Sequence, residues 1–177
     1  MGILLVSLFA AGGCQRPIET IQLREVNEIP WEENLLLWEG VVLTASSYNR
    51  ENERVENLLD NNPDTFWHID ESLEGSPAWV AADFGEGEAV AVSALAVRPR
   101  NGYGDQFFRN AQVQASNDDI DWETIAWLLQ IARPEEAVWY RCDFDNREPY
   151  RFWRLLILDG HIGRRGHFLS IGDLALF

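Results

Sequence analysis

One segment of the chain reads Glu56-Asn57-Leu58-Leu59-Asp60-Asn61-Asn62-Pro63-Asp64-Thr65-Phe66-Trp67-His68, a turn rich in oxygen-bearing side chains and followed by two aromatic residues. Asp60, Asn62 and Thr65 offer carboxylate, amide and hydroxyl oxygens, the ligands that a hard cation such as calcium prefers. The segment lacks the central glycine and final glutamate of an EF-hand, which excludes that kind of site. Because Asn, Pro and Asp are also ordinary turn formers, a calcium loop and a plain turn both stay open.

Beyond residue 39 the chain consists of short runs of Val, Ile, Leu and aromatic residues separated by turns. No amphipathic helix stands between the runs, which predicts an antiparallel β-sandwich or jelly roll with functional loops gathered at one end. The run 151–158 is nearly continuously apolar after Arg154, as is typical of a central strand. The eight predicted strands cover residues 39–45, 79–84, 90–98, 111–116, 122–128, 137–144, 151–158 and 171–177.

Length and charge limit the possible functions. The chain has 177 residues, 46% of them hydrophobic, which suits one domain with an ample core and a short extension. Its formal net charge of -15 repels nucleic-acid phosphates and anionic lipid headgroups. We therefore expect neutral or cationic partners and no nucleic acid.

The first 14 residues are apolar, carry no charged side chain and end in Ala11-Gly12-Gly13-Cys14. They are too few to span a bilayer as a helix. They resemble a bacterial lipoprotein signal, which implies a chain exported to the cell envelope and held on a membrane only by lipid on Cys14. The alternative is a cytosolic chain with an apolar N-terminal helix or strand.

Residues 15–38 form a second region, in which Pro17 and Pro30 interrupt any long helix. We interpret them as a tether or N-terminal extension that packs against the domain formed by residues 39–177. The only other cysteine, Cys142, lies in an alternating run typical of a strand. We expect a buried, inert thiol there and no disulfide in the mature chain.

Six motifs occur in the order in which the discoidin superfamily has them, a superfamily that includes the coagulation-factor type C domains and the family 32 carbohydrate-binding modules. The resemblance covers roughly residues 39–177 and implies an all-β fold, an antiparallel eight-stranded β-sandwich of the jelly-roll type. The motifs are Ala45-Ser46-Ser47 with the segment 56–68, Trp79–Gly85, Val97–Arg100, Ala115–Trp122, Arg151–Leu155 and Phe168–Leu174.

The resemblance also implies a structural calcium ion between the first loop and the last strand. Asn61 replaces the glycine of the family pattern, and we expect it to adopt the left-handed conformation that asparagine tolerates. Asp173 replaces a longer glutamate. The implied ligands are the carbonyl of Leu59 and the side chains of Asp60, Asn62, Thr65 and Asp173.

Loops at one end are implied to bind a glycan. By resemblance, His68 binds a hydroxyl group, Arg100 is the sugar-binding arginine and Phe168 is the stacking aromatic; Arg98 is expected to pair with nearby acids instead. The residues themselves leave other interpretations open, such as a structural His68. Further candidates are Asn101 and Tyr103 in the next loop, His161 in the last loop, and the pair Arg164-Arg165, which either recognises a carboxylate or balances nearby acids.

No nucleophile elbow, phosphate-binding glycine motif or metal-ligand histidine spacing is visible, so we expect no enzyme. The first hypothesis is a non-catalytic module that binds a glycan or polysaccharide. The alternative is a protein-interaction or adhesion domain of the cell envelope that uses the same loops. Phospholipid binding is a third possibility, which the net charge of -15 disfavours.

Overall fold

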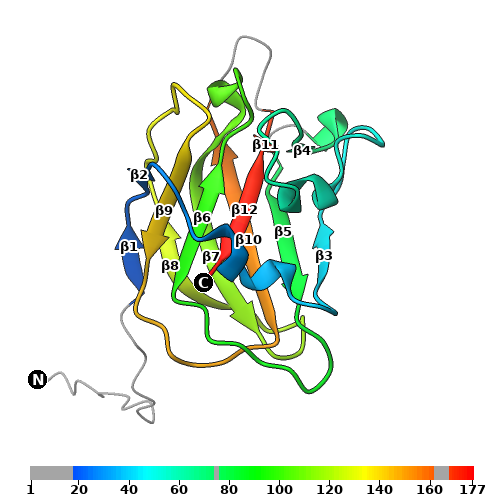
Figure 1. Ribbon diagram of the computed structural model, residues 1–177, viewed down its shortest axis with the longest axis vertical. Coiled ribbons are helices and arrows are strands. Elements are labelled where there is room, and N and C mark those ends of the chain that lie inside the picture. Colours follow the sequence, from blue (N-terminus) through cyan, green and yellow to red (C-terminus); the bar gives the residue numbers. More distant parts are fainter. Residues whose placement is uncertain (1–17, 74–75, 162–167) are drawn as a thin grey trace, which may run out of the picture.

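A computed structural model describes residues 18–73, 76–161 and 168–177, and in these residues the fold is a β-sandwich (Figure 1). The larger sheet has the strand order β1-β8-β7-β10-β5-β3, and the smaller one β12-β6-β9-β2. A third, two-stranded sheet pairs β11 with β4. The strands are β1 Glu19–Ile21, β2 Arg24–Val26, β3 Val42–Ala45, β4 Trp67–His68, β5 Ala78–Asp83, β6 Ala94–Arg98, β7 Phe108–Ser116, β8 Glu123–Leu128, β9 Trp139–Asp143, β10 Phe152–Gly160, β11 Ser170–Ile171 and β12 Asp173–Leu176.

Every helix in the described residues is a short 3₁₀ turn, as an all-β prediction requires. The turns are η1 Trp31–Glu33, η2 Leu35–Leu37, η3 Val55–Leu59, η4 Glu71–Leu73 and η5 Gly104–Gln106. No described helix is long and apolar enough to cross a membrane. Each predicted strand overlaps an observed one, which confirms the predicted sandwich.

The core lies between the two larger sheets. In β10 the buried residues Trp153, Leu155 and Ile157 alternate with partly exposed ones, because successive side chains of a strand point to opposite faces. This strand pairs with both β5 and β7, as expected of a central strand. Cys142 on β9 is also buried, and burial raises the pKa of its thiol to about 12, so the thiol is inert at neutral pH.

The N-terminal extension adds a strand to each large sheet. Glu19–Ile21 pairs with β8 in parallel, the one departure from the predicted antiparallel pattern in the described residues, and Arg24–Val26 pairs antiparallel with β9. Buried Asn34 then joins the extension to β12, since its amide donates to the carbonyl of Leu174 at 3.2 Å and its oxygen accepts from the backbone N–H of Leu176 at 3.0 Å. Strands of two or three residues carry no readable periodicity, which is why β1, β2 and β4 were not predicted.

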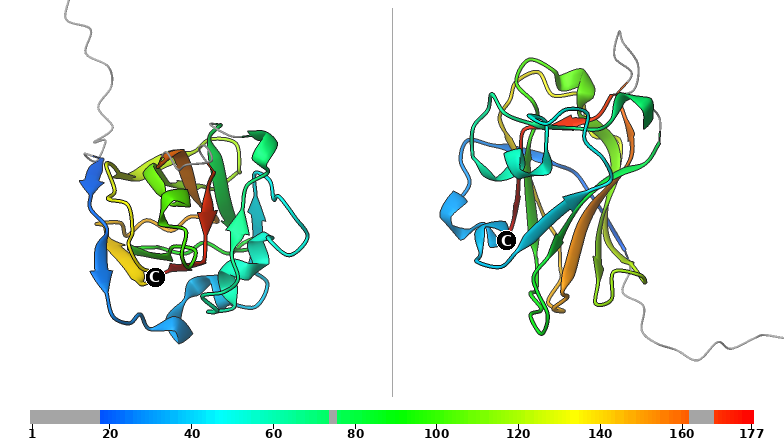
Figure 2. Two further views of the ribbon diagram at one scale, coloured as in Figure 1. Left: turned by 90° about the horizontal axis from the view of Figure 1, so that it is seen from above. Right: turned by 90° about the vertical axis from the view of Figure 1, so that its right-hand side faces the viewer.

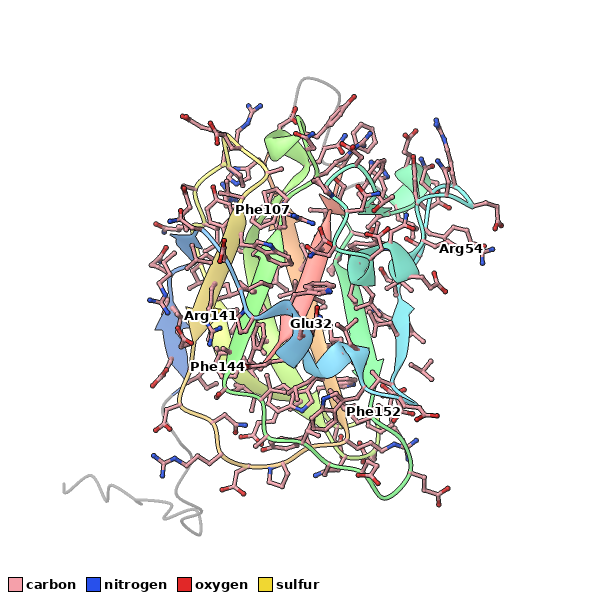
Figure 3. The ribbon with its side chains drawn as sticks, viewed as in Figure 1. Glu32, Arg54, Phe107, Arg141, Phe144 and Phe152 are labelled. Carbon is pink, nitrogen blue, oxygen red and sulfur yellow. The ribbon has the colours of Figure 1, made fainter. Side chains whose placement is uncertain are left out.

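The loops gather at two ends of the sandwich. One end carries β4, β11 and η5, uppermost in Figure 1, and we call it the β4–β11 end. The other, which we call the opposite end, is formed by the connections 84–93, 117–122 and 144–151. Figure 2 shows the same separation from the side, and in Figure 3 Phe107 lies toward the β4–β11 end while Phe144 and Phe152 lie toward the opposite end.

Candidate functional site

The β4–β11 sheet fixes His68 next to Phe168. His68 is opposite Ser170 in the antiparallel register, and its ring centroid lies 5.9 Å from that of Phe168. Its Nδ1 lies 2.7 Å from the carbonyl oxygen of Ile69. A carbonyl only accepts, so Nδ1 carries a proton. His68 is only 3% exposed, so little of its side chain is open to a ligand.

Arg100 is held between two aromatic rings. Its guanidinium carbon lies 3.6 Å from the ring centroid of Phe66 and 3.8 Å from that of Tyr103. Burial lowers the pKa of Arg100, while the charges of Tyr103 and Glu53 raise it and Arg50 lowers it. An arginine side chain stays protonated in proteins, so Arg100 carries a positive charge. The two rings fix the orientation of its guanidinium.

Gln106 connects Arg100 to the β4–β11 sheet. Its Oε1 accepts a hydrogen bond from Nη1 of Arg100 at 3.0 Å and another from Oγ of Ser170 at 2.9 Å. Since Ser170 is the partner of His68, Arg100, His68 and Phe168 belong to one connected group. The structure therefore brings together three of the residues that the resemblance implied.

The loop after Arg100 is exposed and lies against the first loop. Tyr103 is 44% exposed, and Nδ2 of Asn101 lies 3.5 Å from Oδ1 of Asp64. Gly104 allows a close approach of this loop to its neighbour, since a Cβ there would lie 1.9 Å from the carbonyl oxygen of Pro134. Both predicted loop residues, Asn101 and Tyr103, thus flank Arg100.

His161 takes a different position. Its backbone N–H donates to the carbonyl of Phe107 at 3.2 Å, and no described contact joins it to His68 or Arg100. Its Nε2 is buried without a hydrogen-bond partner in the described residues. Burial lowers its pKa, and the charges of Arg109 and Arg133 lower it further, while Asp159 and the backbone of Ile131 raise it. The pair Arg164-Arg165 lies outside the described residues.

Sequence reasoning missed Phe66, Glu53 and Gln106. Phe66 could have been predicted, because neighbouring residues of a strand point to opposite faces. Trp67 is buried, so Phe66 points away from it and toward the loops. Glu53 is 6% exposed, and its carboxylate accepts from Nδ2 of Asn49 at 2.9 Å. Neither Glu53 nor Gln106 stands in a motif, so their roles depend on how loops distant in sequence meet.

The predicted calcium loop is closed by its own hydrogen bonds. The Thr65 hydroxyl lies 2.7 Å from Oδ2 of Asp60, and the backbone N–H of Asn62 donates to Oδ1 of Asp60 at 2.9 Å. Asn61 has a φ angle of 53°, the left-handed conformation expected of it. Leu59 is the last residue of η3, directly before these residues.

Asp173, the last implied ligand, is fully buried at the start of β12. Its Oδ2 accepts from Nε of Arg98 at 2.7 Å, and Oδ1 has no hydrogen-bond partner in the described residues. Burial raises the pKa of Asp173 to about 6 and the charge of Asp60 adds to the rise, while Arg98 and the backbone of Asn61 oppose it. Among the described residues, no group of three or more His, Cys, Asp or Glu side chains is arranged to hold a metal. Calcium binding stays a prediction.

The model of the F5/8 type C domain matches residues 42–158, more than half of the chain. The protein belongs to this family. This confirms the resemblance to the discoidin superfamily inferred from the six motifs. Comparison with curated proteins finds no match.

Solved structures share the fold of this F5/8 type C domain. A carbohydrate-binding module of Clostridium perfringens in complex with GalNAc-β-1,3-galactose has a TM-score of 0.64 at 19% identity, over 77% of this chain and 94% of that one. The family 32 module of C. perfringens NanJ, in complex with galactose, has 0.60 at 21%, over 77% and 92%. A chitosan-binding module of a Paenibacillus chitosanase/glucanase has 0.59 at 18%, over 81% and 96%.

Proposed function

We propose that the protein is a non-catalytic carbohydrate-binding module whose ligand lies on the β4–β11 end. The observation that carries the proposal is Arg100, clamped between the rings of Phe66 and Tyr103 and bonded to Gln106. Sugar sites combine an aromatic surface for the apolar face of the ring with a few fixed polar groups for its hydroxyls. The solved carbohydrate-binding modules of the same fold support this choice.

Each residue then has a distinct task. The exposed ring of Tyr103 stacks on the sugar, and the guanidinium of Arg100 donates to hydroxyl oxygens. Nε2 of His68 accepts from a hydroxyl, because its Nδ1 proton is engaged with the carbonyl of Ile69. Asn101 supplies both a donor and an acceptor at the rim. We assign none of these residues to proton transfer or nucleophilic attack, so the proposal includes no reaction.

A protein partner is the second candidate, and one observation favours it. Three large apolar side chains near η2 and β3 are exposed, namely Leu37 at 39%, Trp38 at 53% and Val42 at 57%. These three residues lie within six positions of the sequence, and exposed apolar groups that form a patch are typical of protein contacts. They lie on elements other than the β4–β11 end, so a protein and a glycan would use different surfaces.

We also propose that the module is displayed on the bacterial cell envelope by lipid attached to Cys14. The support is the apolar, uncharged segment that ends in Ala11-Gly12-Gly13-Cys14. Labelling of expressing cells with a radioactive fatty acid tests the proposal. We expect label on the wild-type protein and none on Cys14→Ser, whereas equal labelling of both proteins would contradict it.

A glycan array with the chain from Gln15 onward tests the binding function. Arg100→Ala should weaken any hit about 10- to 100-fold, because charged hydrogen bonds contribute roughly 1.5–3 kcal/mol. Arg154→Ala is the matched control, since Arg154 lies 3.9 Å from the ring of Trp122 toward the opposite end. Its binding should equal that of wild type. An array without hits, or equal losses in both variants, would contradict the proposal.

A further inference from the structure

The first loop and β12 are joined by an arginine side chain. Arg98, the last residue of β6, donates through Nε to Oδ2 of Asp173 at 2.7 Å and through Nη2 to Oδ1 of Asn61 at 3.2 Å. Its side chain is 11% exposed and that of Asp173 is fully buried. One guanidinium therefore connects the last strand to the turn that follows η3.

The same position is where the family resemblance implies calcium. A calcium ion takes six to eight oxygen ligands and is favoured by uncompensated carboxylates. Here the carboxylate of Asp173 is already compensated by Arg98, and that of Asp60 accepts from Thr65 and Asn62. A cation placed beside Asp173 would also face the positive guanidinium at close range, which is repulsive in a buried site. The residues present do not fit a divalent cation.

We propose that the guanidinium of Arg98 takes the place of a divalent cation in this domain and holds the first loop on β12. The link is independent of the proposed glycan function, because it concerns the support of the loop and no ligand contact. The ring of Trp139 fixes the guanidinium from another side, with its centroid 4.9 Å from the guanidinium carbon. A fixed guanidinium needs no ion from solution, so the loop keeps its structure in the presence of a chelator.

The free oxygen of Asp173 gives the proposal a second consequence. When Arg98 is replaced by an uncharged side chain, both oxygens of Asp173 become available close to Asp60. Two uncompensated carboxylates, the Thr65 hydroxyl and nearby carbonyls are the donor set that calcium prefers. Removal of the arginine should therefore create a response to calcium that the natural protein lacks.

Thermal melting of the chain from Gln15 onward, in chelator and in excess calcium, tests the inference. Wild type should melt at the same temperature in both. Arg98→Met should melt roughly 10 °C lower in chelator, because removing one partner of a buried ion pair is strongly destabilising. Calcium should restore part of that loss. Arg98→Lys, which keeps the charge but not the planar fork, should lose less and stay insensitive to calcium.

The matched control is Arg141→Met. Arg141 lies on the neighbouring strand β9, pairs with Asp143 at 2.8 Å and lies over the ring of Phe177 at 4.8 Å, and neither of these contacts involves the first loop. This control should lose only a few degrees, because its ion pair is exposed. A wild-type protein that melts lower in chelator would overturn the proposal. So would an Arg98→Met variant that loses no more than the control, or that gains no calcium response.

Discussion

The two ends of the sandwich differ in whether their polar side chains have hydrogen-bond partners. At the opposite end, Asp118 accepts from the hydroxyl of Ser116 and the backbone N–H groups of Ile120 and Asp121. Among described residues, the buried side-chain atoms without a partner all belong to segments of the β4–β11 end, and they are Nε of Arg54, Nε2 of His161 and Oδ1 of Asp173. Buried polar groups are normally satisfied. The unused hydrogen-bonding capacity of the described buried side chains therefore lies at the β4–β11 end.

Two buried tryptophans give the largest expected effect. Trp67 donates from Nε1 to the carbonyl of Ser47 at 2.8 Å, and Trp153 donates to that of Val90 at 3.2 Å. Each change to phenylalanine leaves a carbonyl unpaired and a small cavity, so both should lower the free energy of unfolding by about 2 kcal/mol. Only Trp67→Phe should also weaken glycan binding, as measured by titration calorimetry. Equal binding losses would show that the two ends are not independent.

Two glycines, one at each end of the sandwich, hold loops with different expected roles. Gly104 lies against Pro134, so Gly104→Ala must displace the loop that carries Tyr103 and Gln106, and we expect glycan binding to fall at least tenfold. Gly87, at the opposite end, has a φ angle of 82° and open space around it. Gly87→Ala should cost stability through its backbone conformation while binding stays unchanged. Retained binding in Gly104→Ala would contradict the assignment of this loop.

Asp83 should make the stability of the opposite end depend on pH. Arg151 donates to both oxygens of Asp83 at 2.7 and 2.8 Å, and these hydrogen bonds lower the pKa of Asp83 despite partial burial. A lowered carboxyl pKa stabilises the fold above the ordinary pKa of about 3.9, and that contribution is lost as pH falls through the folded value. Asp83→Asn should therefore melt a few degrees lower than wild type at neutral pH.

The difference between Asp83→Asn and wild type should shrink as the pH falls below the ordinary carboxyl pKa of about 3.9. Glycan affinity at neutral pH should be the same for both proteins, since Asp83 lies away from the β4–β11 end. A melting difference that persisted in acid would show that the amide side chain disturbs packing and that charge is not the cause.

His161 gives the smallest effect. Burial holds its pKa below the usual 6.5, so the ring is neutral at pH 7 and Nε2 stays an acceptor. A lowered histidine pKa also means that its contribution to stability is lost as pH falls below 6.5. Titration of the ring resonances by NMR should give a midpoint below that value. A midpoint at or above 6.5 would place His161 in contact with solvent or with an acid.

The sequence predicted the strands and the motifs, because hydrophobic periodicity and turn residues are local properties. Arg98 was correctly expected to pair with an acid, while the role of Arg100 in binding a glycan stays a prediction. The link through Gln106 could not be predicted, because Gln106 and Ser170 are 64 positions apart and one oxygen of Gln106 accepts from both Ser170 and Arg100. The strands of the N-terminal extension could not be predicted either, since a three-residue strand such as β1 has too few positions to show alternation.

The parallel pairing of β1 with β8 also decides how the module faces its surroundings. β8 runs from the opposite end toward the β4–β11 end, and Glu19 follows the same direction beside Ala126. The chain therefore enters the domain from the opposite end. Nine residues of β10 span roughly 30 Å at the usual rise of a strand. If the domain is attached to a surface through its N-terminal side, as proposed above, the loops of the β4–β11 end would face away from that surface.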